Sequence, residues 1–223
     1  YKRQPPDPAA DRAAGLGQAD PQRSFQADSR NRDASQAPEL GSAYAPAGPL
    51  HNSGGQNAAE PAATIVLVSN GPGEMTTWVR PLADELHRLL PLRPRDPQAS
   101  CSLQLVVVPC PNATGQEARL ARGWGLFSRV LPAGRFWWLL LRPARHGPWP
   151  RQGVVVFLGG DQFWTVLLSA RLGYRHLTYA EWVARWPQWN DHIATMGSKA
   201  SRRLAPRWRT RSTEVGDLMA DLS

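Results

Sequence analysis

Continuous apolar runs mark the expected strands of this chain. Residues 64–69, 103–108 and 154–158 are short runs dominated by Val, Leu and Ile. Such runs are typical of strands buried on both faces of a parallel sheet, because a half-exposed strand would alternate apolar and polar residues. Residues 176–179 and the region near 213–215 indicate two further strands.

Helical periodicity follows the first and third of these runs. After the first, large apolar side chains recur on one side at helical spacing: Trp78, Val79, Leu82, Leu86 and Leu89. Thr77 is the expected N-cap of this helix, which would place Pro81 in its first turn, where proline costs little. A second helix is expected to begin at Gln162, to run to Arg171 and to be closed by Gly173.

The alternation of strands and helices predicts an α/β fold, a Rossmann-like parallel sheet with helices on both faces. Ligands of such sheets bind beyond the carboxyl ends of the strands. Two loops, residues 70–77 and 159–163, therefore form the candidate site.

Composition changes sharply near residue 60. Residues 1–60 contain no Val, Ile or Trp, and six Lys and Arg face seven Asp and Glu. A segment this poor in large apolar residues cannot bury enough surface to offset its ordering entropy, so we expect a disordered tail and linker. The folded domain is expected over residues 61–223.

The expected domain is strongly basic. Residues 61–223 hold 20 Lys and Arg against 11 Asp and Glu, together with all ten tryptophans. Two explanations of the bias toward Arg are equally good. One is genomic base composition, and the other is a surface that binds nucleotide phosphates, acidic lipid headgroups or nucleic acid. Charge alone does not choose between these partners.

The first loop reads Asn70-Gly-Pro-Gly-Glu74 at a strand-to-helix turn. Gly71 and Gly73 would let the backbone approach a ligand, or would simply allow a tight turn. Glu74 is a candidate site carboxylate or a first-turn acid stabilised by the helix dipole. The segment is not the dinucleotide-binding fingerprint, because Thr76 stands where the third glycine would fall.

Asp161 opens the second loop, directly after Gly159-Gly160. It fits the N-cap of the helix that follows, and it equally fits a general base at the crevice. One residue can serve both roles.

Two segments are rich in tryptophan. Residues 179–190 hold three tryptophans and Tyr179, which suits core packing or a sugar-binding surface. Residues 134–149 combine a short apolar run with three arginines. This composition fits either a membrane interface or a buried helix with exposed ends.

Other chemistries lack their residues. Cys101 and Cys110 flank one expected strand, too far apart for a disulfide, which favours a reducing, cytosolic setting. No metal-ligand spacing, phosphate loop, nucleophile elbow or DNA-reading motif occurs, so we expect no metal and no cofactor, and nucleic acid is not the favoured partner. No apolar run is long enough to span a membrane.

Four segments in order carry a resemblance to a known family. Residues 73–78 (GEMTTW), 161–171 (DQFWTVLLSAR), 179–189 and 215–221 (VGDLMAD) are similar to motifs of the lipid-A-disaccharide synthase family of glycosyltransferases. The segment 69–74 (SNGPGE) looks like the divergent form of that family found in cyanobacteria. Trp78 stands where the family has Asp, so a different sugar and acyl specificity is expected.

The resemblance implies the amino-terminal, acceptor-side half of a two-domain GT-B glycosyltransferase, with the donor domain beyond Ser223 and missing from this chain. It implies Asp161 as the general base, with Glu74 as the second catalytic residue. The implied substrate-binding residues are Asn70, Gly71, Gly73, Thr76, Thr77, Trp78, Gly160, Tyr179 and Trp182.

The sequence therefore predicts an enzyme that transfers a sugar from a UDP-sugar to a lipid-linked or phosphorylated sugar acceptor. It is expected in the cytoplasm, in peripheral contact with the inner membrane face. Two alternatives stay open: a non-catalytic basic module that binds acidic lipid or RNA, and a nucleotide-sugar epimerase.

Overall fold

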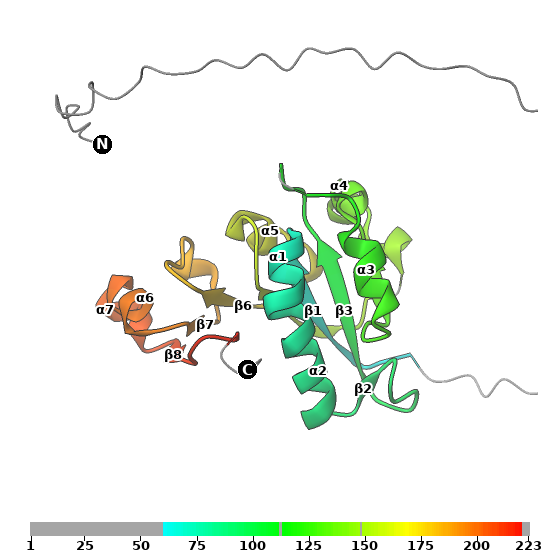
Figure 1. Cartoon of the computed structure of the whole chain (residues 1–223), viewed down its shortest axis with the longest axis horizontal. Coiled ribbons are helices and arrows are strands. Elements are labelled where there is room, and N and C mark those ends of the chain that lie inside the picture. Colours follow the sequence, from blue (N-terminus) through cyan, green and yellow to red (C-terminus); the bar gives the residue numbers. More distant parts are fainter. Residues whose placement is uncertain (1–59, 112, 148, 220–223) are drawn as a thin grey trace, which may run out of the picture. The chain divides into compact units, whose positions relative to one another are not determined.

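The computed structural model describes residues 60–111, 113–147 and 149–219. The expected tail and linker, residues 1–60, lies outside this part of the chain except for Glu60. The described residues form one sheet with helices around it (Figure 1). The sequence-based expectation of a parallel α/β fold is confirmed.

The sheet contains eight strands in the order β2-β3-β1-β5-β6-β7-β8, and the short β4 also pairs with β3. Every pairing is parallel. The strands are β1 (Ala63–Ser69), β2 (Leu92–Arg93), β3 (Cys101–Val107), β4 (Arg129–Leu131), β5 (Gln152–Phe157), β6 (Arg175–Ala180), β7 (His192–Thr195) and β8 (Ser212–Glu214). The five expected strands are present, whereas β2, β4 and β7 were not predicted.

In the described residues, seven α-helices connect the strands: α1 (Pro72–Glu74), α2 (Arg80–Leu89), α3 (Glu117–Gly123), α4 (Phe136–Leu141), α5 (Gln162–Leu172), α6 (Ser198–Arg203) and α7 (Pro206–Arg209). A π-helical turn over Met75–Val79 joins α1 to α2. Short 3₁₀ turns occupy Ala133–Arg135, Pro143–His146 and Pro187–Trp189.

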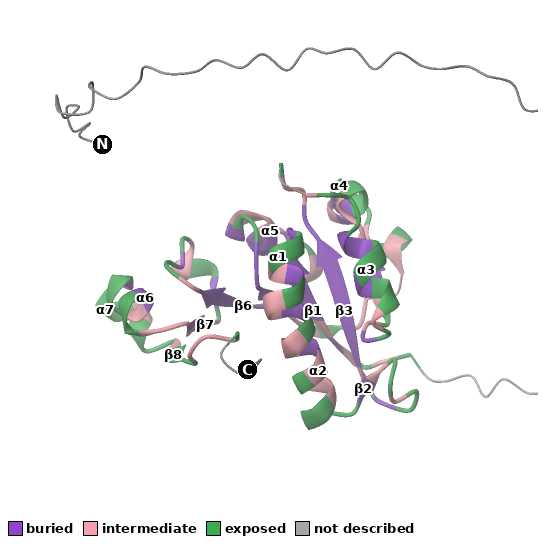
Figure 2. Ribbon diagram, in the orientation of Figure 1, coloured by how far each residue is buried: buried purple, intermediate pink, exposed green. Residues whose placement is uncertain are grey.

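The central strands are buried on both faces, as their unbroken apolar runs predict. Leu67 of β1 packs on one face among residues of α2 and α3. Its neighbours Val66 and Val68 point to the other face and pack with α4 and α5. Figure 2 shows the central strands β1 and β3 buried and the outward sides of the helices exposed. Helices therefore cover both faces of the sheet.

The first helix begins earlier than the sequence predicts, so Thr77 as its N-cap is wrong. Helical structure starts at Pro72, and Thr77 lies in the π-helical turn. Pro81 has no N–H and its ring would crowd the carbonyl one turn earlier, so a widened turn just before it lets the helix continue. The backbone N–H of Arg80 accordingly bonds to Met75, five residues back.

The second helix follows its prediction closely. Asp161 caps α5 by accepting a hydrogen bond from the backbone N–H of Phe163 at 3.0 Å. Gly173 ends the helix in the left-handed conformation, with φ of 69°. These two local signals fix both ends of α5 and therefore the direction of the turn before it.

Candidate functional site

The candidate site lies where the chain reverses its direction of travel across the sheet. β1 and β5 are neighbours in the sheet, and the chain leaves β1 toward β2 and β3 on one side but leaves β5 toward β6 on the other. In parallel sheets such a switch point leaves a crevice beyond the carboxyl ends of the strands. The loops after β1 and β5, both predicted from the sequence, meet there.

A pocket of about 330 Å³ occupies this position. Three loops line it, those that follow β1, β5 and β6. Its wall comprises Glu74, Trp78, Phe157, Leu158, Gly159, Gly160, Asp161, Gln162, Tyr179, Glu181, Trp182, Val183 and Arg185. Clefts of this size with aromatic walls and a few converging polar groups are the usual form of small-molecule sites.

Two glycines let the loops after β1 and β5 touch. A Cβ at Gly159 would lie 2.8 Å from Cγ of Glu74 and 3.0 Å from the hydroxyl oxygen of Ser69. Gly160 has φ of 99°, and a Cβ there would lie 3.2 Å from Cγ of Asn70. Larger residues would therefore push the two loops apart and open the crevice.

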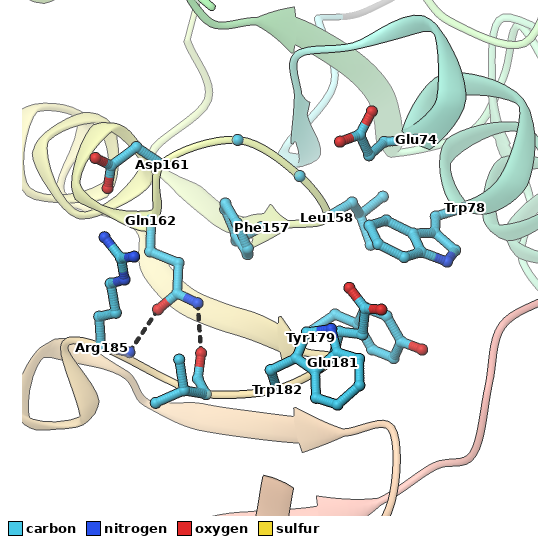
Figure 3. Close-up of a pocket in the computed structure, with 13 residues that line it drawn as sticks. Glu74, Trp78, Phe157, Leu158, Asp161, Gln162, Tyr179, Glu181, Trp182 and Arg185 are labelled. Carbon is cyan, nitrogen blue, oxygen red and sulfur yellow. Dashed lines mark hydrogen bonds between the residues drawn. The ribbon is translucent and has the colours of Figure 1, made fainter. Parts of the chain in front are cut away.

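Asp161 is exposed, and one of its carboxylate oxygens is used by the helix cap. The cap uses Oδ1 alone, so Oδ2 can serve chemistry without undoing the helix start. Figure 3 shows Asp161 and Glu74 on either side of the turn that joins β5 to α5. Trp78, Tyr179 and Trp182 group together beyond Leu158.

The pocket is acidic although the domain is basic. Glu74, Asp161 and Glu181 contribute three carboxylates, and Arg185 is the one cation among the lining residues. Such a wall repels a ligand with several phosphates and suits hydroxyl or ammonium groups, which donate hydrogen bonds to carboxylates. Arg185 offers a single place for an anionic group.

Gln162 holds the third loop against the second. Its side-chain oxygen accepts from the backbone N–H of Arg185 and its amide nitrogen donates to the carbonyl of Val183, both at 2.7 Å (Figure 3). Gln162 is buried, so both bonds are shielded from water. The pocket wall from β6 is therefore anchored to the first turn of α5.

Tyr179 is a buried support of the wall. Its ring meets that of Trp78 edge-on, with centroids 5.7 Å apart. Its hydroxyl donates to the carbonyl of Gly216 and accepts from the N–H of Leu218, each at 3.4 Å. Burial raises the pKa of this hydroxyl, and the carboxylates of Asp217 and Glu181 raise it further.

The structure brings together only some of the residues expected at the site. Glu74, Trp78, Gly160, Asp161, Tyr179 and Trp182 line the pocket. Asn70 is buried behind the glycine turn, with its side-chain oxygen unpaired. Gly71 is the buried N-cap of α1.

Thr76 and Thr77 do not line the pocket. Both hydroxyls bond to the carbonyl of Gly73, at 3.1 and 2.9 Å, within their own helix. Both hydroxyls are therefore used in hydrogen bonds to backbone carbonyls next to the widened turn. The two threonines stabilise the local backbone in this structure.

Glu181 and Arg185 were not predicted as site residues, and Gln162 was not named individually although it lies in the expected loop 159–163. A signal was present, because residues 181–185 directly follow an expected strand and so belong to the same edge of the sheet. Trp186 and Trp189, which share the tryptophan-rich segment, stack on each other at 5.2 Å, and Trp186 also packs on Phe163. Of the three tryptophans, only Trp182 lines the pocket.

Within the described residues, no helix has the length and apolar content needed to cross a membrane. No three His, Cys, Asp or Glu side chains gather there in a metal-binding arrangement. Cys101 and Cys110 are not joined by a disulfide.

Comparison with models of protein families and with curated proteins found no match for the chain.

Proposed function

We propose that the pocket receives a sugar acceptor and that the protein to which this chain belongs is a UDP-sugar-dependent glycosyltransferase of the GT-B type. The observation that carries the proposal is that three residues with carboxylate side chains line the same pocket as Trp78 and Trp182. Carboxylates accept hydrogen bonds from sugar hydroxyls, and indole faces pack against the apolar faces of sugar rings.

The charge of the pocket supports an acceptor rather than a nucleotide here. A UDP group would bring its pyrophosphate against three carboxylates and a single cation, Arg185. A sugar with one phosphate or none fits the wall better. The donor would then be held by another domain, in line with the GT-B arrangement that the resemblance implies.

In the proposed reaction Asp161 is the general base. Its carboxylate takes the proton of an acceptor hydroxyl, and the oxygen attacks the anomeric carbon of the donor. The bond from that carbon to the UDP oxygen breaks, UDP leaves with the electron pair, and the new glycosidic bond has inverted configuration. Glu74 and Glu181 would orient the acceptor hydroxyls.

A test of Asp161 needs a variant that removes its proposed role as a base and keeps its role as a helix cap. Asn caps helices as well as Asp does, whereas Ala costs about 1 kcal/mol at this position. Asp161→Asn removes the base and keeps the cap, so it should abolish UDP release with sugar acceptors without lowering the melting temperature. The assay uses the full-length protein and a panel of UDP-hexoses.

The matched control is Glu181→Gln, which removes a carboxylate from the same pocket without touching the proposed base. It should weaken acceptor binding and retain measurable turnover. Full turnover by Asp161→Asn would remove Asp161 from the mechanism, and loss of turnover only in Asp161→Ala would reduce it to a helix cap.

A further inference from the structure

α4 leaves large apolar side chains in solvent. It follows β4 through a single 3₁₀ turn and packs Phe136 and Leu139 into the core. On its other side Trp137, Trp138 and Leu141 are exposed by 52%, 54% and 67%. Two exposed indoles beside an exposed leucine on one short helix are unusual for a surface that meets only water.

Arginines surround these side chains. Arg135, Arg142 and Arg145 are exposed, and with Trp138 and His146 they line a hollow of about 380 Å³. Residues 118–160 contain seven arginines and no Asp or Glu. The ion pairs in the described part of the chain all involve α2 or the loop after it, so none neutralises this region.

The helix is held firmly in place. Arg171 of α5 donates to the carbonyls of Leu140 and Leu141 at 2.7 and 3.4 Å. Trp137 packs edge-on against Trp164 of α5, with ring centroids 5.1 Å apart. The exposed side chains therefore sit on a fixed support, and binding through them needs little further ordering of the backbone.

We propose that α4 docks the protein on an anionic lipid bilayer, through a surface made of Arg135, Trp137, Trp138, Leu141, Arg142 and Arg145, the α4 surface. The arginines would bind lipid phosphates in the hollow, and the indoles and Leu141 would enter the boundary between headgroups and acyl chains. Tryptophan and arginine are the residues that favour this interface.

The exposed leucine favours lipid over RNA. Single-stranded RNA binds arginine and stacks its bases on aromatic rings, so it could use part of this surface. Leu141 is the most exposed of the three apolar side chains and has no flat face for stacking. Acyl chains, in contrast, gain from contact with an aliphatic side chain.

The α4 surface and the pocket belong to the same edge of the sheet. α4 starts just after the carboxyl end of β4, which is parallel to β1 and β5. Figure 1 accordingly shows α4 beyond the arrowhead end of β3. A bilayer at α4 would lie near the edge where the pocket forms. Docking itself stands independently of the proposed sugar transfer.

The test measures binding of the whole chain to vesicles, with no sugar present. Wild type should bind vesicles of phosphatidylcholine with phosphatidylglycerol and leave those of phosphatidylcholine alone largely unbound. The triple variant Arg135→Gln, Arg142→Gln and Arg145→Gln should bind roughly a hundredfold more weakly, since each arginine near an anionic surface contributes about a factor of five. Trp138→Ser with Leu141→Ser should lose at least about tenfold.

Matched controls come from other exposed positions. Trp189→Ser with Leu89→Ser removes two side chains exposed by 50% and 59%, and Arg202→Gln, Arg207→Gln and Arg211→Gln remove three charges from α6 and α7 and the turn after them. Both should bind as wild type does, and melting temperatures check that every variant folds.

Equal loss in the controls would mean diffuse attraction and overturn the proposal. Absence of binding to anionic vesicles would also overturn it. A labelled oligouridine that binds with the same dependence on the α4 surface, while vesicles do not, would assign the surface to RNA instead.

Discussion

The ring of Trp78 meets the ring of Tyr179 edge-on at 5.7 Å, with the two planes at 67°. Trp78 comes from the helix after β1 and Tyr179 from β6, so this contact joins two strand ends on either side of β5. The Tyr179 hydroxyl continues the contact to Gly216 and Leu218 beyond β8. One buried phenol therefore connects the pocket wall to the end of the described chain.

Removing only the hydroxyl of Tyr179 should have a small effect. Both of its hydrogen bonds are long, at 3.4 Å, so Tyr179→Phe should lower the free energy of unfolding by no more than about 1 kcal/mol. Tyr179→Ala also removes the ring from the core and should cost about 3–5 kcal/mol. Urea unfolding compares the two, and equal losses would contradict the role assigned to the ring.

Substitution of Gln162 should strongly lower the free energy of unfolding, although the residue is polar. Gln162→Leu keeps the size but leaves the N–H of Arg185 and the carbonyl of Val183 without partners, at a cost of about 2–4 kcal/mol. Gln162→Glu keeps the acceptor for Arg185 and loses the donor to Val183. Hydrogen exchange of the Arg185 amide should therefore speed up in the Leu variant and change less in the Glu variant. Unchanged exchange in both would contradict the anchoring role.

A side chain at Gly160 should destabilise the fold more than one at Gly173. Gly160→Ala combines φ of 99° with contacts of 3.1 and 3.2 Å to Val108 and Asn70. Gly173→Ala is the matched control, since its φ is 69° but nothing lies within 4 Å of the added Cβ. Both should be destabilised by about 1 kcal/mol for the backbone, and Gly160→Ala by about 1–2 kcal/mol more. Equal melting temperatures would show that the loop yields freely.

Acid should destabilise the domain through His176. The residue is 2% exposed, and burial lowers the pKa of its ring from 6.5, while the carbonyl of Trp189 and the charge of Asp191 act in the opposite direction. The unfolded chain binds a proton at a higher pH than the fold does, so stability should fall as pH drops below about 6.5, by at most ~1.4 kcal/mol per pH unit.

The variant His176→Gln removes the group that binds this proton. The free energy of unfolding of the variant should therefore fall less steeply over the same pH window. His192→Gln, which removes a less buried histidine from the neighbouring strand β7, is measured beside it for comparison. Urea unfolding at several pH values gives the slopes, and an unchanged slope in His176→Gln would assign the acid sensitivity to other groups.

Local and periodic signals explain what the sequence predicts well. The apolar runs of β1, β3 and β5 follow directly from burial on two faces, and Asp161 and Gly173 mark the ends of α5 through their own backbone chemistry. Thr77 was assigned wrongly because a good capping residue was weighed without the widened turn before Pro81. The short strands β2, β4 and β7 were missed because none of them contains a long run of apolar residues.

Local signals in the sequence also predicted part of the candidate site. Asp161 and Glu74 lie next to strand ends that the sequence reveals, whereas Gln162 acts through backbone groups of residues 183 and 185 that only the folded chain brings near. Thr76 and Thr77 were expected to bind substrate from the resemblance, but their hydroxyls bond within the helix. Motif position alone does not show where a side chain points.

The pocket at the ends of β1, β5 and β6 is proposed to hold a sugar, and nuclear magnetic resonance of the indole N–H groups tests this directly. Glucosamine 1-phosphate is a suitable probe, because its ammonium group suits the carboxylates and its single phosphate suits Arg185. Titration should shift the signals of Trp78 and Trp182, which line the pocket, and leave that of Trp189 unchanged. Asp161→Asn should preserve the shifts, since the base is needed for transfer rather than for holding the sugar. Unmoved signals of Trp78 and Trp182, or equal shifts of all the indoles, would contradict a sugar site at this edge of the sheet.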